Sequence, residues 1–223
     1  GLYETVTWSF TDSRWAKLFG ELKEGLYLAN PISSDLDIMR PNALINMIAA
    51  AGRNQARGFS DLALFEVGPE FFGDQPGDQR LVAAGLRAGA TTERSWTGSC
   101  RDVDVFDVKA DAEALIEALG TNAANVQVNT DGAPEWYHPG RSGTLALGPA
   151  ALAYFGELHP AVAREMEADG PVAVFEVMLD AVPEPKLRSG AARNPLELSP
   201  YQAVVRDFAF MVDTDVAHHR LVG

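Results

Sequence analysis

Two histidines and a carboxylate in the middle of the chain are residue types that could form a metal or hydrolytic site. His138 lies four residues before Ser142, and Glu157 is separated from His159 by one residue. Imidazole nitrogens and a carboxylate can bind zinc, and a histidine beside a serine can act as a general base. The spacing matches neither a zinc-binding helix nor the G-x-S-x-G nucleophile motif. A structural role in turns is therefore favoured, and the alternative is a stand-alone hydrolase or metal enzyme using His138, Glu157 and His159.

Phosphate-binding and cysteine-based motifs are absent from the sequence. There is no G-x-x-x-x-G-K-[ST] loop, and no G-x-G-x-x-G lies where a strand would run into a helix. A P-loop or Rossmann nucleotide site is therefore not expected. Cys100, the only cysteine, excludes an intrachain disulfide and a cysteine-based zinc site, which fits a reducing compartment.

The 223 residues have an acidic balance, with 18 Lys and Arg against 31 Asp and Glu and a net charge of −13. Non-specific nucleic-acid binding depends largely on Lys and Arg displacing counterions from phosphates, so a broad phosphate-binding surface is disfavoured. The longest apolar runs fall far short of the ~20 residues that a membrane span needs. We expect a cytoplasmic protein with no membrane partner, and the abrupt ends of the sequence suggest a piece of a longer chain.

The elements that would position these side chains follow an α+β pattern. Alternating apolar residues predict strands, and apolar residues at helical spacing predict helices. The predicted strands are residues 4–10, 62–67, 80–87, 143–147, 152–158, 172–179 and 203–213. The predicted helices are a short one ending near residue 19, then 41–57, 108–119 and one beginning near residue 160. Strands joined by short turns indicate an antiparallel sheet flanked by helices.

A linker is predicted near the C-terminal end. Residues 182–200 contain four prolines and a glycine, which interrupt helices and strands. The charge balance also changes there, because residues 186–223 carry a net charge of +1 and the first 185 residues carry −14. We predict a core domain over residues 1–185, a linker over 186–200 and the truncated start of a second domain over 201–223.

Six segments, spread in order over nearly the whole chain, resemble one family. They are residues 30–40 (NPISSDLDIMR), 64–68 (LFEVG), 104–109 (DVFDVK), 137–143 (YHPGRSG), 156–160 (GELHP) and 205–210 (VRDFAF). Together they resemble the large (beta) subunit of bacterial phenylalanyl-tRNA synthetase, in the C-terminal half of that subunit. The resemblance implies that residues 1–185 form a class II aminoacyl-tRNA synthetase-like core. It also implies that residues 201–223 begin a ferredoxin-like anticodon-binding domain.

The resemblance also implies the activity and partners of the whole enzyme. That ligase attaches phenylalanine to its tRNA with ATP and Mg²⁺, and it is a heterotetramer of two alpha and two beta subunits. The expected partners are the catalytic alpha subunit and phenylalanine tRNA. The editing site of the family lies outside the matched region.

This segment itself is expected to be a catalytically inactive scaffold. A working class II site holds the α-phosphate with an arginine near the motif 2 strand, whereas the corresponding strand here carries Glu66 and Glu70. The glycines around Arg141 do not reproduce motif 3. We therefore expect ATP to be repelled, and we assign no catalytic, cofactor-binding or metal-binding residue.

The helix predicted over residues 41–57 is expected to contact the alpha subunit. An apolar stripe on such a helix is more often part of the core than of an interface. The resemblance favours the interface interpretation over the core interpretation, because the helix matches the position of motif 1, which builds the subunit interface in class II enzymes. The predicted contact residues are Met39, Arg40, Leu44, Met47 and Ile48.

Overall fold

The computed structural model describes residues 1–92, 95–96, 98, 100–185, 201–202, 204–214, 216 and 221. Contacts divide the chain into two units, Gly1–Lys186 and Leu187–Gly223. The linker predicted over residues 186–200 lies outside the described residues.

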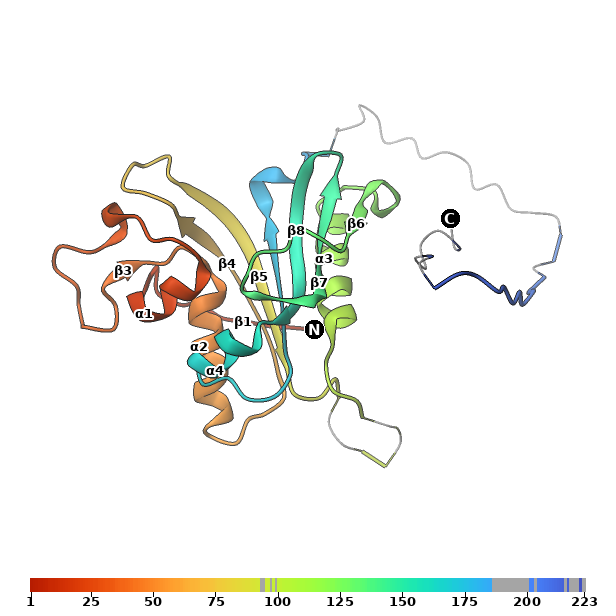
Figure 1. The fold of residues 1–223 in the computed structure, drawn as a ribbon, viewed down its shortest axis with the longest axis horizontal. Helices are drawn as coiled ribbons and strands as arrows, with labels where there is room; N and C mark the ends of the chain where they lie inside the picture. The colour runs from red at the N-terminus through yellow and green to blue at the C-terminus, as the bar shows by residue number, and fades with distance from the viewer. Residues whose placement is uncertain are drawn as a thin grey trace. The chain divides into compact units, whose positions relative to one another are not determined.

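A seven-stranded sheet forms the centre of the first unit (Figure 1). In order across the sheet, its strands are β1 (Tyr3–Glu4), β4 (Leu62–Phe71), β5 (Gln79–Ala88), β9 (Val172–Met178), β8 (Ala150–Leu158), β7 (Tyr137–Leu147) and β6 (Gln127–Asn129). Every neighbouring pair is antiparallel except β1 with β4, which is parallel. A separate antiparallel pair joins β2 (Phe10–Thr11) to β3 (Ile38–Met39). The α+β class with a largely antiparallel sheet is therefore confirmed.

Helices cover both faces of this sheet. The α-helices are α1 (Ser13–Ala16), α2 (Leu44–Gln55), α3 (Val105–Ala118) and α4 (Pro160–Glu165), and 3₁₀ turns cover Lys17–Phe19, Glu24–Leu26, Ala123–Asn125 and Leu179–Ala181. In Figure 1, α3 lies on one side of the sheet, and α2 and α4 lie on the other. Among the described residues, no helix is long and apolar enough to cross a membrane.

Two helices begin at residues that the apolar pattern alone did not identify. Helix α3 begins three residues before the predicted start, because the Asp104 side chain accepts from Phe106 N (2.8 Å) and the Asp107 side chain accepts from Asp104 N (2.9 Å). This reciprocal capping box satisfies N–H groups that the helix leaves unpaired. Helix α2 begins three residues later than predicted, where Leu44 N donates to the Asn42 side chain (2.8 Å).

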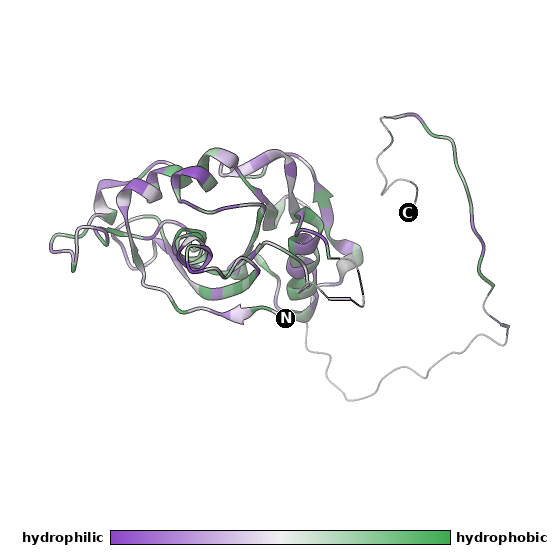
Figure 2. Cartoon of the chain, turned by 90° about the horizontal axis from the view of Figure 1, so that it is seen from below, coloured by the Kyte–Doolittle hydropathy of each residue, from purple (hydrophilic) through white to green (hydrophobic). Residues whose placement is uncertain are grey.

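The two faces of the sheet carry two separate hydrophobic clusters. Successive residues of β5 point to opposite faces, so Val82 and Leu86 join the cluster under α2 whereas Ala83 joins the cluster under α3. Gly85 lies opposite Phe175 in the ladder, and a side chain at Gly85 would collide with the phenyl ring. Hydrophobic residues accordingly recur along the strands and the flanking helices (Figure 2).

Four predicted strands are wrong in extent or absent. The strand predicted over residues 62–67 continues to Phe71 in β4, and the strand predicted over residues 143–147 begins at Tyr137 in β7. The strand predicted over residues 4–10 is reduced to β1 and β2. The last hydrogen bond to β4 is donated by Thr5 N to Phe65 O (2.7 Å). Beyond it the chain leaves the edge of β4, and Val6 and Trp8 are exposed. The strand predicted over residues 203–213 is not formed: described residues 204–213 lie in no strand. A strand needs a partner ladder for its N–H and C=O groups, and no described residue of the second unit supplies one.

Candidate functional site on the sheet face under α2

A row of polar side chains crosses the sheet on the face that α2 covers. Cross-strand pairing places Thr144 opposite Tyr154, Tyr154 opposite Glu176, Glu176 opposite Ala84, and Ala84 opposite Glu66. Residues directly opposite one another in a ladder point to the same face. Polar residues from four strands thus form one row across the sheet, interrupted only at Ala84 of β5.

Glu66 is neutralised by a buried arginine from the segment before α2. Arg40 Nη1 donates to Glu66 Oε1 (2.7 Å), Thr7 Oγ1 donates to Glu66 Oε2 (2.8 Å), and Arg40 Nε donates to Pro69 O (3.0 Å). The two charged side chains are only 2% and 6% exposed. A Cβ at Gly68 would collide with the Arg40 guanidinium, so the glycine provides the space for this pair.

Glu70 lies four residues after Glu66 on the same face of β4, and it forms a second ion pair, with Arg80. Its Oε2 accepts from Arg80 Nε (2.9 Å) and Arg80 Nη2 (2.7 Å), and its Oε1 accepts from Ala43 N (3.0 Å). Ala43 immediately precedes α2, so this carboxylate lies at the positive end of the helix dipole. The Arg80 guanidinium also lies 4.8 Å from the centre of the Phe72 ring.

Glu176 differs from the other two carboxyl groups, because its hydrogen bonds go to neutral side chains. The Asn42 amide donates to its Oε1, and the Tyr137 hydroxyl lies 3.2 Å from its Oε2. Burial, followed by the nearby Glu70 charge, raises the pKa of Glu176 to about 8. Burial, followed by the Glu176 charge, also raises the pKa of Tyr137 well above its ordinary value.

This polar network has a structural role, and it contains no obvious reactive group. Both guanidinium groups, of Arg40 and Arg80, are already bound by carboxylates of the same face. Sequence reasoning identified Glu66 and Glu70 as carboxylates at this position but missed their arginine partners. It also missed Glu176, although a single acidic residue within the apolar run Val172–Met178 was a readable signal.

The residues of the alternative metal or hydrolase site do not act together. His138 Nδ1 accepts from Gly140 N (3.1 Å), and His159 Nδ1 accepts from Ala161 N (3.1 Å) at the start of α4. Glu157 pairs with an arginine, and Ser142 Oγ donates to the backbone oxygen of His138 rather than to its ring. Within the described residues, no group of three or more His, Cys, Asp or Glu side chains could hold a metal ion.

The segment between β6 and β7 passes over the sheet face (Figure 1), and its residues line an open cavity. The cavity has a volume of about 590 Å³, and residues 130–135 supply much of its wall. His159 lines it together with Tyr137 and Ser142, whereas His138 and Glu157 do not line it. Ala133 and Trp136 of this segment pack against the hydrophobic cluster under α2.

The predicted contact residues on α2 lie inside the first unit. Leu44, Met47 and Ile48 have no exposed surface, Arg40 is 1% exposed, and Met39 is half-buried. Leu44, Met47 and Ile48 belong to the hydrophobic cluster on this face of the sheet. Because atoms of the same chain already surround them, they form no exposed docking surface. Their contact with another subunit stays a prediction that a single chain does not test.

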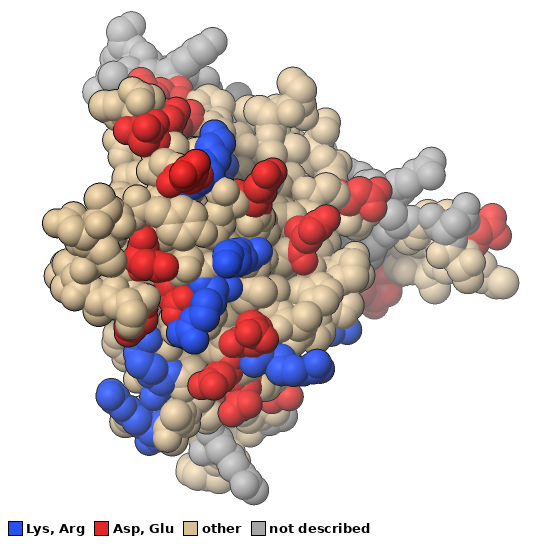
Figure 3. Space-filling view, turned by 60° about the vertical axis from the view of Figure 1, so that its left-hand side comes forward, with Lys and Arg blue, Asp and Glu red and all other residues tan. Residues whose placement is uncertain are grey.

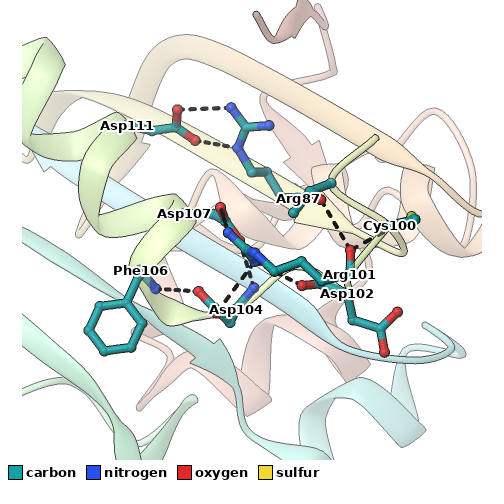
Figure 4. A network of polar contacts seen from close by, with 9 residues as sticks. Arg87, Cys100, Arg101, Asp102, Asp104, Phe106, Asp107 and Asp111 are labelled. Atoms are coloured by element: carbon teal, nitrogen blue, oxygen red, sulfur yellow. Dashed lines mark hydrogen bonds and ion pairs between the residues drawn. The ribbon is translucent and has the colours of Figure 1, made fainter. Parts of the chain in front are cut away.

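A second polar network lies on the opposite side of the sheet and holds α3 in place (Figure 4). Arg87 of β5 pairs with Asp111 (2.6 Å), and Arg101 pairs with Asp107 (2.7 Å). The hydrogen bond that Arg101 donates lowers the pKa of Asp107, and the hydrogen bonds that Arg87 donates to Asp111 raise the pKa of Arg87. These pairs are partly exposed, unlike the Arg40–Glu66 pair under α2. On the molecular face shown in Figure 3, acidic and basic side chains are interspersed.

Comparisons with known proteins give a consistent result. Residues 1–179 match the family model described as the phenylalanyl tRNA synthetase beta chain CLM domain. The chain is 57% identical over 217 residues to a phenylalanine–tRNA ligase beta subunit of Rhodospirillum rubrum, covering 97% of this chain and 27% of that protein. It is 51% identical over 222 residues to the one of Paramagnetospirillum magneticum, covering 100% of this chain and 28% of that protein.

A solved structure shares the fold at low sequence identity. A pyrrolysyl-tRNA synthetase from Desulfitobacterium hafniense superposes with a TM-score of 0.59 and 17% identity, covering 82% of this chain and 62% of that chain. The likeness concerns the fold alone. The chain spans about a quarter of the length of the curated relatives that it matches.

Proposed function

The chain belongs to the phenylalanyl-tRNA synthetase beta chain family, and from this membership we propose that it is a non-catalytic region of a phenylalanine–tRNA ligase beta subunit. The whole enzyme would attach phenylalanine to its tRNA in the cytoplasm, using ATP and Mg²⁺. In our proposal residues 1–185 are a class II synthetase-like core, and residues 201–223 begin a ferredoxin-like anticodon-binding domain.

The observation that carries the inactive assignment is the buried pairing of Glu66 with Arg40. In our proposal Glu66 takes the place where a class II site would need a cation, and the nearby guanidinium groups of Arg40 and Arg80 are paired with carboxylates. The side chains of this face therefore do not fit a triphosphate, and we assign no step with ATP or Mg²⁺ to them. The carboxylates that were expected to repel ATP are paired with arginines, so we propose that these buried pairs, rather than charge repulsion alone, exclude ATP.

The proposed role is to support the catalytic alpha subunit in a heterotetramer of two alpha and two beta subunits, with phenylalanine tRNA as the substrate of the assembly. Of the five residues predicted to contact the alpha subunit, only Met39 offers a part-exposed side chain. It is therefore the position at which the interface proposal can be tested with the least disturbance of the core, against which Met39 packs.

Co-elution with the alpha subunit tests the scaffold role. The wild-type chain is mixed with the alpha subunit and separated by size exclusion, alongside Met39→Glu and the control Phe106→Glu. Phe106 is 71% exposed and lies on α3, on the opposite side of the sheet. We expect binding to be weakened by Met39→Glu and unchanged by Phe106→Glu. Loss of binding only in Phe106→Glu would move the interface to the α3 side, and no wild-type co-elution would contradict a self-sufficient interface.

Pyrophosphate exchange tests the absence of catalysis. The chain alone, with phenylalanine, ATP and Mg²⁺, is expected to show no phenylalanine-dependent exchange, whereas the alpha–beta assembly should show it. Exchange by the chain alone would refute the inactive assignment while leaving its family membership intact.

A further inference from the structure

Glu176 is a buried titratable side chain that the proposed function does not use. It lies in the middle of β9, a strand whose residues are all buried, and it is 1% exposed. Its carboxyl oxygens contact the Asn42 amide and the Tyr137 hydroxyl, and both groups are neutral. We call Asn42, Tyr137 and Glu176 the Glu176 cluster.

The surroundings of the cluster contain more carboxyl groups than guanidinium groups. Arg40 pairs with Glu66 and Arg80 pairs with Glu70, both at 2.7 Å. Among the described residues, no ion pair involves Glu176. An ionised carboxylate without a cationic partner is strongly unfavourable in apolar surroundings, and such a group takes up a proton instead.

We infer that Glu176 is held as a neutral carboxylic acid, and that its ionisation releases Tyr137 and the segment 130–136 from the sheet. The reason is that the three side chains come from three different parts of the fold. Asn42 precedes α2, Glu176 lies on β9, and Tyr137 is the first residue of β7, directly after the segment that borders the cavity. Tyr137 both lines the cavity and contacts Glu176, so an opening at Tyr137 would admit water from the cavity to an ionised Glu176.

The direction of the pH dependence follows from the environment of the carboxyl group. The titratable, charged or polar groups that face it are Glu70 of β4, Arg80 of β5, Tyr137 of β7, Tyr154 of β8, and Asn42 before α2. Burial and Glu70 raise the pKa of Glu176 from 4.5 to about 8. The protonated cluster therefore stabilises the closed segment fully below about pH 4.5, and this stabilisation is lost as the pH rises to about 8.

Amide hydrogen exchange on the full chain tests the release. The reporters are the Tyr137 amide, bonded to Pro134 O (3.0 Å), and the His159 amide, bonded to Trp136 O (2.8 Å). After correction for intrinsic exchange, their opening constants should rise by up to about tenfold per pH unit between pH 5 and 8 in the wild type, relative to Glu176→Gln. The same slope in both proteins would overturn the inference.

Two controls keep the test specific. Glu117→Gln removes an exposed carboxylate at the end of α3 and should retain the wild-type slope. The Val103 amide, bonded to Gly89 O (2.9 Å) outside the cluster, should show no such slope, and an equal slope there would contradict a local release.

An infrared titration examines the wild-type protein directly, in case Glu176→Gln folds poorly. The carbonyl band of a protonated, buried carboxyl group should be present at pH 6 and should disappear as the pH passes about 8. Absence of this band at pH 6 would refute the neutral state of Glu176.

Discussion

The two faces of the sheet are stabilised by different interactions. The buried cluster under α3 consists of hydrophobic side chains, including Phe155, Phe175 and Ile116. The cluster under α2 is also hydrophobic, but buried ionisable residues interrupt it. They are Arg40, Glu66, Glu70 and Glu176. The stability of the α3 face therefore depends mainly on the close packing of side chains, whereas the stability of the α2 face also depends on the pairing of charges.

This difference predicts how each face responds to a substitution. In a close-packed hydrophobic cluster, a change in side-chain volume costs stability in proportion to the cavity or the overlap that it creates. In a buried charge network, removal of one partner leaves the other charge without compensation, which costs more than the pair itself contributes. The α2 face should therefore be the less tolerant of the two.

Removal of the Arg40 guanidinium should have the largest effect. Arg40→Met leaves the buried Glu66 carboxylate without its cation, so the free energy of unfolding should fall by about 3–5 kcal/mol. The denaturant midpoint of the chain, measured by circular dichroism in urea, checks this value. Arg53→Met, which changes an exposed arginine on α2, is the control and should leave the midpoint nearly unchanged. Equal shifts in the two variants would refute the role of the buried pair.

A methyl group added on the α3 face should have an intermediate effect. The Cβ of Gly85→Ala would collide with the Phe175 ring, and overpacking of this kind costs about 1–3 kcal/mol. The same urea titration measures the loss. Gly77→Ala is the matched control, because an added Cβ there meets no atom within 4 Å. A loss in Gly85→Ala larger than that in Arg40→Met would reverse the proposed order of the two faces.

Loss of a helix cap on the α3 side should have the smallest effect. Asp104→Ala removes the acceptor of the Phe106 N–H, and substitutions of this kind cost about 1 kcal/mol. Hydrogen exchange should also speed up in the first turn of α3, since those amides lose their acceptor. Asp102→Ala, two residues earlier and exposed, is the control. If Asp104→Ala changes neither stability nor exchange, the capping box does not anchor the start of α3.

Local sequence patterns predicted most elements of the first unit. The antiparallel pair β4–β5 and the apolar side of α3 follow from hydrophobic periodicity, which needs only neighbouring residues. Boundaries were less accurate where polar partners decide them: α2 begins at Leu44, where Asn42 and Glu70 accept its first N–H groups. The capping box of α3 was readable from the sequence, since Asp104 and Asp107 have the required spacing.

The sequence by itself determined the family, the acidic balance, the antiparallel α+β class and the presence of carboxylates on β4. Only the tertiary structure decided which groups those carboxylates meet. Arg40 and Glu66 are 26 residues apart, and Asn42 and Glu176 are 134 residues apart. Strand order and register bring these groups together, because β9 lies between β8, its neighbour in sequence, and β5, a strand from much earlier in the chain. For the same reason the residues predicted for a subunit interface lie in the core. An apolar stripe on a helix specifies that the stripe is buried, but the surface that buries it depends on which part of the fold is nearest.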